Sequence, residues 1–173
     1  MKIYKMKNVL FLLIAILAFS GCRKLTTFKI YESSEFIIPG TPANVPVFSN
    51  MPVSNSASYQ FSNNGADAKH VKEVKLDQLT LTIIDPPTKN FDFLNSIHIY
   101  ISADGLSEIE LAYSDNIPLG VSSFDLTTTG AILDAYIKKD AYQLRIETIT
   151  DELLSENTTI KSDMTFKVRA KIL

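Results

Sequence analysis

The clearest pattern in the chain is a period of two near its C-terminal end. The apolar positions of this segment are Ile160, Met164, Phe166, Val168, Ala170 and Ile172. The polar positions between them are Lys161, Asp163, Thr165, Lys167, Arg169 and Lys171. Because successive side chains of a strand point to opposite faces of a sheet, this alternation predicts a strand with one packed face and one wet face.

The same alternation recurs earlier in the chain. It is visible in segments 28–38, 74–83, 97–101, 108–113 and 142–146. In segment 74–83 the phase slips at Asp77-Gln78, which predicts a β-bulge or a crossing from one sheet to the other. Four prolines between residues 39 and 52 indicate an extended edge segment or loop, since proline cannot donate to a central ladder. Residues 54–68 are expected to form a loop with at most one helical turn.

One segment has helical spacing instead. Its apolar residues Ile132, Leu133, Tyr136 and Ile137 form a single stripe, and the hydroxyls of residues 127–129 could cap its start. Lys138 and Lys139 fall at the end of a helix that favours cations. The pattern predicts one short helix near residues 130–139.

These elements predict a mainly β protein, an antiparallel β-sandwich with immunoglobulin-like or Greek-key connectivity, six or seven strands and one short helix. The true immunoglobulin signature is absent, because the chain has no tryptophan and only one cysteine. A partly closed barrel covered by the helix is the alternative.

The first residues follow a different pattern. Lys2, Lys5 and Lys7 precede a run from Val9 to Phe19 without a polar side chain. Eleven apolar residues in a helix span roughly half of a ~30 Å hydrocarbon core, so the run is too short for a stable membrane span. It has the features of an export signal.

The residues Ser20-Gly21-Cys22 end this run, and Cys22 is the only cysteine of the chain. Here the sequence resembles a bacterial lipoprotein signal, although Phe19 stands where an aliphatic residue is usual. The resemblance implies cleavage between Gly21 and Cys22, a diacylglycerol on the sulfur of Cys22 and an acyl chain on its amino group. Several acyl chains hold a protein stably at a membrane, whereas one holds it only marginally.

The resemblance divides the chain into a cleaved signal peptide (1–21), a lipidated N-terminus with a short tether (22–27) and one β-sandwich domain (28–173). This organisation resembles that of uncharacterised envelope lipoproteins of Gram-negative bacteria. Arg23 and Lys24 follow the cysteine, so neither the inner-membrane aspartate nor an acidic surface-export run is present. The expected location is the periplasmic face of the outer membrane, with surface exposure as the alternative.

Composition removes several classes of function. The net charge of −2 becomes −5 when the three lysines of the signal are removed, and no basic block suggests nucleic-acid binding. The nucleophile, zinc and phosphate-loop motifs of common enzyme families are missing. We therefore expect no enzyme and no cofactor other than the lipid on Cys22.

Two groups of residues are candidates for binding. His98 and Tyr100 share a phase and, with Tyr113 or Tyr31, could form a sugar- or protein-binding face, but burial of these residues under the helix at 130–139 is the favoured expectation. Four carboxylates are weak calcium candidates, but their spacing matches no calcium loop, so solvated charges are preferred and no metal site is expected. They are Asp104, Glu108, Glu110 and Asp115.

A third surface is the polar side of the last strand. Lys161, Lys167, Arg169 and Lys171 could contact acidic partners or lipid head groups, although a solvated face that prevents aggregation is sufficient to explain them.

The sequence thus predicts a lipid-anchored, non-enzymatic binding or structural module of the cell envelope. Its partner would be an envelope protein or a glycan. The alternative is a lipid-handling accessory protein, in which the helix gates an apolar cavity. An envelope hydrolase is the least favoured class.

Overall fold

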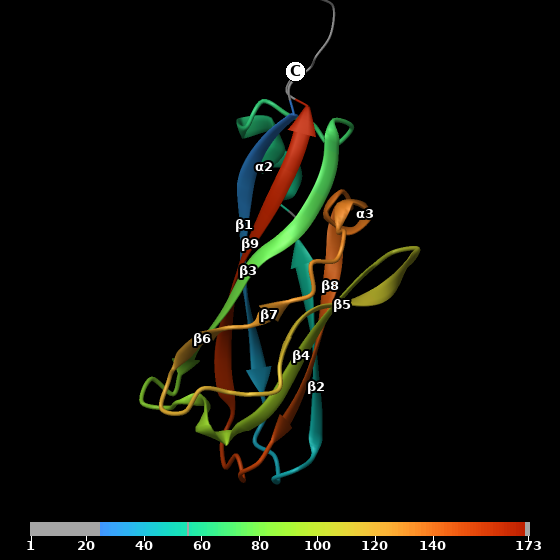
Figure 1. The fold of residues 1–173 in the computed structure, drawn as a ribbon. Coiled ribbons are helices and arrows are strands. Elements are labelled where there is room, and N and C mark those ends of the chain that lie inside the picture. Colours follow the sequence, from blue (N-terminus) through green and yellow to red (C-terminus); the bar gives the residue numbers. More distant parts are fainter. Residues whose placement is uncertain (1–24, 55, 172–173) are drawn as a thin grey trace, which may run out of the picture.

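The protein folds as two antiparallel β-sheets packed face to face (Figure 1). The structure is a computed structural model that describes residues 25–54 and 56–171. The expected signal peptide, its cleavage site at Gly21 and the lipidated Cys22 lie outside the described residues. Among the described residues, no helix is both long and apolar enough to cross a membrane.

The first sheet has the strand order β1-β9-β3-β6 and the second has the order β2-β8-β4-β5-β7. In the first sheet the strands are β1 Leu25–Ile38, β9 Thr158–Lys171, β3 Val71–Asp85 and β6 Ser123–Asp125. In the second they are β2 Pro46–Ser54, β8 Ala141–Thr150, β4 Leu94–Ala103, β5 Leu106–Ser114 and β7 Thr127–Thr128. The predicted β-sandwich is confirmed. The strand count is higher than expected because β6 and β7 have three and two residues, too few to show a period.

The long strands follow the alternation of the sequence. Along β9 the inward side chains from Thr158 to Ala170 are buried, and Lys167 and Arg169 are exposed on the other face. β1 pairs with β9 over its whole length, from Leu25 opposite Lys171 to Ile38 opposite Thr158. The slip predicted in β3 is a bulge, since its register with β9 shifts between Leu76 and Gln78.

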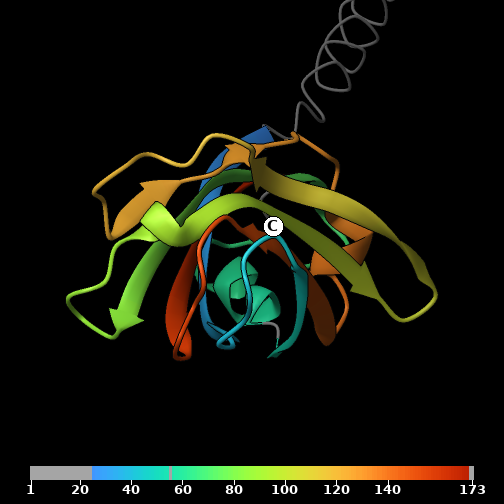
Figure 2. The ribbon, with the colours of Figure 1, turned by 90° about the horizontal axis from the view of Figure 1, so that it is seen from below.

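The proline-rich segment forms β2, an edge strand of the second sheet, as expected. The following segment contains a helix longer than one turn, α2 (Ala57–Asn63), in which Ala57 and Phe61 are buried. Seen along the strands, α2 lies between the two sheets (Figure 2). Gln60 of α2 also covers the open edge of β1, because its side chain accepts from the Tyr31 N–H at 2.8 Å and donates to the Tyr31 carbonyl at 2.7 Å.

The predicted helix near 130–139 is shorter and lies elsewhere than expected. Helix α3 spans only Asp134–Ile137, because the capping threonines belong partly to β7 and Gly130 adopts a positive φ of 70°. Tyr136 and Ile137 are buried; the Val74 N–H donates to Asp134 at 2.7 Å. The Tyr136 hydroxyl donates to the Ser107 carbonyl at 2.7 Å. α3 therefore connects β3 to β5 across the sandwich and does not cover the outer face of the second sheet.

Between the sheets the described residues form one continuous core. Its largest buried side chains include Phe61, Phe91, Phe166 and Tyr142. A 3-10 turn (Phe91–Phe93) contributes Phe91, which packs edge-on against Phe124 at 4.8 Å between ring centroids.

Candidate functional site

The outer face of the second sheet carries an ordered set of polar and aromatic side chains. The strand registers place them in three rows across the sheet. The first row is Phe48, Glu147, His98 and Tyr113; the second is Asn50, Arg145, Tyr100 and Glu110; the third is Pro52, Gln143 and Ser102. We call these residues, together with Glu108 of β5, the array. Along β2, β4 and β8 these side chains alternate with the more buried residues, so they face away from the core. On β5 a register shift between Ile99 and Tyr100 places Glu110 and Tyr113 on the same outer face, on either side of buried Leu111 and Ala112.

His98 links the β5 side of the array. Its Nδ1 lies 2.7 Å from Glu110 Oε1, and its Nε2 lies 3.1 Å from Asp115 Oδ1. Its ring is nearly parallel to those of Tyr113 and Tyr100, at 5.8 and 6.4 Å between centroids. Partial burial disfavours the imidazolium, but the hydrogen bonds to the two carboxylates and their negative charge outweigh this effect and raise the pKa of His98.

Arg145 links the β8 side. It donates to Glu108 through Nε at 3.0 Å and Nη2 at 2.8 Å, and to Glu147 through Nη1 at 3.1 Å. Its Cζ also lies 4.1 Å from the centroid of the Tyr100 ring and 5.9 Å from that of Phe48. Hydrogen bonding to Glu108 raises the pKa of Arg145, so its charge is permanent. A guanidinium held on two sides and stacked on a ring fixes the neighbouring side chains in place.

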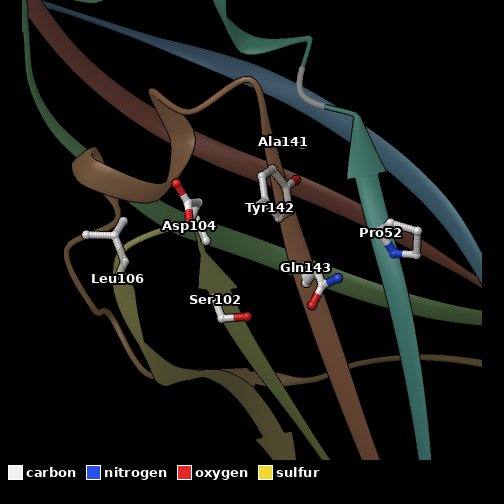
Figure 3. Close-up of a pocket in the computed structure, with 8 residues that line it drawn as sticks. Pro52, Ser102, Asp104, Leu106, Ala141, Tyr142 and Gln143 are labelled. Atoms are coloured by element: carbon white, nitrogen blue, oxygen red, sulfur yellow. The ribbon is translucent and has the colours of Figure 1, made fainter.

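The third row of the array opens into a hollow of about 550 Å³. Figure 3 shows Ser102 and Gln143 between Pro52 of β2 on one side and the β4–β5 hairpin, with Asp104 and Leu106, on the other. Ala103, Ala141 and Tyr142 complete the lining. The hollow is thus a direct continuation of the array toward one end of the sheet.

The structure brings together three residues singled out from the sequence. His98, Tyr100 and Tyr113 are half-buried neighbours on one face, and no helix within the described residues covers them; their role in binding stays a prediction. The expectation that the helix buries them is wrong, because α3 packs between the sheets. Tyr31 does not join them, since it lies on β1 in the other sheet and is 61% exposed.

The four acidic candidates do not converge on one point. Glu108 pairs with Arg145, Glu110 and Asp115 pair with His98, and Asp104 lines the hollow. Across the part of the chain that the structure describes, no group of three or more His, Cys, Asp or Glu residues could hold a metal ion. Glu108, Glu110 and Asp115 act as partners of Arg145 and His98.

Sequence reasoning missed Arg145, Phe48 and Gln143. The available signal was weak: Arg145 is the outward residue between Leu144 and Ile146, in a segment whose alternation was recognised. Which strands flank β8 depends on long-range pairing, and the alternation of one strand does not reveal its neighbours.

No protein-family model matches the chain, and no curated protein matches it. Solved structures are similar in fold only. The decameric BFDV capsid protein is 9% identical with a TM-score of 0.40, over 85% of this chain and 99% of that one. A structure of infectious bursal disease virus, Gt strain, is 12% identical with a TM-score of 0.40, over 86% of this chain and 33% of that one.

A structure of carbohydrate-binding modules from the β-sandwich superfamily is 9% identical with a TM-score of 0.35, over 88% of this chain and 57% of that one. Likenesses at this level carry no argument about function.

Proposed function

We propose that the protein is a lipid-anchored, non-enzymatic binding module of the bacterial envelope, and that the array and its hollow bind a neutral or amino-sugar oligosaccharide. The observation that carries the proposal is the array itself. Aromatic rings, a guanidinium and four glutamate or histidine side chains are fixed side by side on one solvent-facing sheet surface.

Sugars suit such a surface for two reasons. Their C–H faces pack against aromatic rings, of which Phe48 is 59% exposed and Tyr113 is partly exposed. Their hydroxyls both donate and accept, so they can bond to carboxylates, the Gln143 amide and the Ser102 hydroxyl. The hollow of about 550 Å³ lies within the range of small-ligand sites, roughly 300–1,000 Å³.

The charge of the site narrows the class of glycan. Its carboxylates are Glu108, Glu110, Glu147, Asp104 and Asp115. Its cations are Arg145 and, when protonated, His98. The resulting negative field repels uronic or sulfated polymers and attracts free amino groups.

The anchor follows from the resemblance at Ser20-Gly21-Cys22. With its acyl chains, the module would face the envelope from the outer membrane, on its periplasmic side. Metabolic labelling with a fatty acid should mark the wild-type protein and disappear in Cys22→Ala. Labelling that persists in the variant would refute the anchor.

The ligand class can be tested by measuring binding of the purified lipidated protein, in detergent, to a panel of neutral, amino-sugar and acidic oligosaccharides. We expect binding to neutral or amino sugars, and at least an about tenfold loss in Gln143→Ala. Gln78→Ala is the matched control, because Gln78 is an exposed glutamine on the outer face of the first sheet.

Binding only to acidic glycans, or equal losses in both variants, would contradict the proposal. If no oligosaccharide binds and a protein partner crosslinks to the array, the ligand of the array would be an envelope protein and not a glycan.

A further inference from the structure

The two ends of the sandwich carry opposite charge. We call the end formed by residues 25–29, 64–75 and 167–171 the anchor end; it carries seven Lys or Arg and only two carboxylates, Asp67 and Glu73. Its cations are Lys29, Lys69, Lys72, Lys75, Lys167, Arg169 and Lys171. Helix α3 contacts this end with one cation and one carboxylate, because the Lys138 Nζ donates to the Val71 carbonyl at 3.1 Å and Asp134 accepts from the Val74 N–H at 2.7 Å.

The far end shows the reverse. It is formed by residues 36–46, 83–93, 114–120 and 149–158, and it carries six carboxylates and a single cation, Lys89. The carboxylates are Asp85, Asp92, Asp115, Asp151, Glu152 and Glu156. β9 connects the two ends with 14 residues, so about 45 Å separates them.

The N-terminal end of the described chain lies at the cationic end. β1 begins at Leu25, opposite Lys171 of β9, and Figure 1 shows the start of β1 and the arrowhead of β9 together at the top of the molecule. Cys22 precedes Leu25 by three residues, which span at most about 10 Å. Any membrane that holds lipid chains on Cys22 therefore lies within reach of the anchor-end lysines.

Some of the cations at the anchor end are paired with carboxylates, and others are not. Lys29 pairs with Asp77, and Lys75 and Arg169 share Glu73. Lys69, Lys72 and Lys167 are exposed and form no ion pair with the residues that the structure describes. Arg23 and Lys24 of the tether add two more positive charges next to Cys22.

We propose that the anchor end docks on the anionic head groups of the membrane and holds the sandwich upright, with the far end repelled from the surface. The proposal rests on the lipid anchor of the proposed function. Juxtamembrane lysines and arginines are attracted to an anionic leaflet within about one Debye length, and carboxylates are repelled. Docking would present the outer faces of both sheets, including the array, sideways to the periplasm.

The test uses the full-length protein, processed and lipidated in cells and reconstituted into vesicles. Acylation occupies the Cys22 sulfur, so a cysteine introduced at exposed Asn63, beside the anchor end, or at exposed Ser155, at the far end, is the only free thiol for a fluorophore. Quenching by a quencher attached to lipid head groups then reports which end is near the membrane. Vesicles contain phosphatidylethanolamine with phosphatidylglycerol, or phosphatidylcholine alone.

We expect strong quenching at position 63 in anionic vesicles and weak quenching at position 155. Quenching at position 63 should fall toward the level of position 155 in neutral vesicles, and in a variant with Lys69→Glu, Lys72→Glu and Lys167→Glu. Lys89→Glu, which reverses a charge at the far end, should leave it unchanged. Equal quenching at both positions, or quenching that ignores the charge reversals, would overturn the docking.

Failure of the anchor is visible separately. At an ionic strength of about 1 M the head-group attraction is screened, so flotation with vesicles then depends on the lipid chains. A protein that does not float at high salt lacks the anchor, which refutes the proposed function and with it the docking. A protein that floats but shows charge-independent quenching keeps the anchor and refutes only the docking.

Discussion

The outer faces of the two sheets come from the same alternating pattern but are built differently. On the first sheet, long flexible side chains pair across strands: Lys29 with Asp77 at 2.8 Å, and Arg169 with Glu73 at 2.9 Å. On the second sheet, planar side chains contact one another, with Arg145 over Tyr100 and His98 beside Tyr113. Alternation alone therefore marks a face as wet, and the kind of polar side chain distinguishes a solvated face from a candidate binding face.

The physical difference is rigidity. Exposed ion pairs between flexible side chains contribute about 0–1 kcal/mol and leave the surface adaptable. A guanidinium with two carboxylate partners and an aromatic neighbour has already lost its conformational freedom in the folded protein. A ligand that binds there therefore does not have to order this side chain. Such preorganisation is what a binding face needs.

The largest effect on stability should come from removing Arg145 on the second sheet, compared with removing Arg169 on the first. Arg145→Ala leaves Glu108 and Glu147 without their cation and exposes Tyr100, so we expect a loss of about 1–2 kcal/mol in the free energy of unfolding. Arg169→Ala on the first sheet is the matched change and should cost less than about 1 kcal/mol, because Glu73 keeps Lys75. Urea unfolding measures both; equal losses would remove the distinction between the faces.

A smaller effect should depend on pH. The raised pKa of His98 means that the folded state favours the imidazolium, so its contribution is fully present below the unfolded pKa of about 6.5 and is lost as pH rises through the folded pKa. We expect His98→Gln to lower the free energy of unfolding by about 1 kcal/mol near pH 5.5 and by less near pH 8.5. The carboxylates that face His98 are Glu110 and Asp115, which lie within hydrogen-bond distance of its ring, and Glu147 on the neighbouring strand β8.

The control is His70→Gln, since His70 has a single carboxylate partner, Asp67, at 2.8 Å. Unfolding followed by circular dichroism at both pH values gives the comparison. A His98→Gln effect that grows with pH would show that the imidazolium is not the favoured form.

The smallest change in the free energy of unfolding is expected for a substitution on the first sheet. Lys161 is partly exposed and pairs with its neighbour Asp163 at 2.9 Å, so Lys161→Ala should change the free energy of unfolding by no more than about 0.5 kcal/mol. Thermal unfolding measures this change. A larger loss of stability would mean that a specific network of side chains also holds the outer face of the first sheet.

Local patterns predicted much of this fold. The alternation in β9 and β1 and the bulge at Asp77-Gln78 depend on neighbouring residues in the chain, and the structure has them as expected. The short strands β6 and β7 were not predicted, because a period of two cannot be recognised in so few residues. The helix was misplaced because its apolar stripe is compatible with burial between the sheets as well as with packing on an outer face.

The candidate site was only half accessible to sequence. His98 and Tyr100 share one strand, so their common face followed from the period. Arg145 and Phe48 reach them through the order β2-β8-β4, which depends on contacts between segments about fifty residues apart or more. Tyr31 was wrongly grouped with these residues for the same reason. Its outward position follows from the alternation, but the alternation does not reveal that β1 belongs to the other sheet.

The most direct test of the binding face is photo-crosslinking in intact envelopes from two equally exposed positions. Phe48 on the second sheet is 59% exposed and Tyr31 on the first is 61% exposed, so a photoreactive phenylalanine at either position meets solvent to the same extent. The account predicts a carbohydrate-containing adduct, sensitive to periodate, from position 48 and none from position 31. Equal adducts from both positions, or an adduct only from position 31, would contradict it.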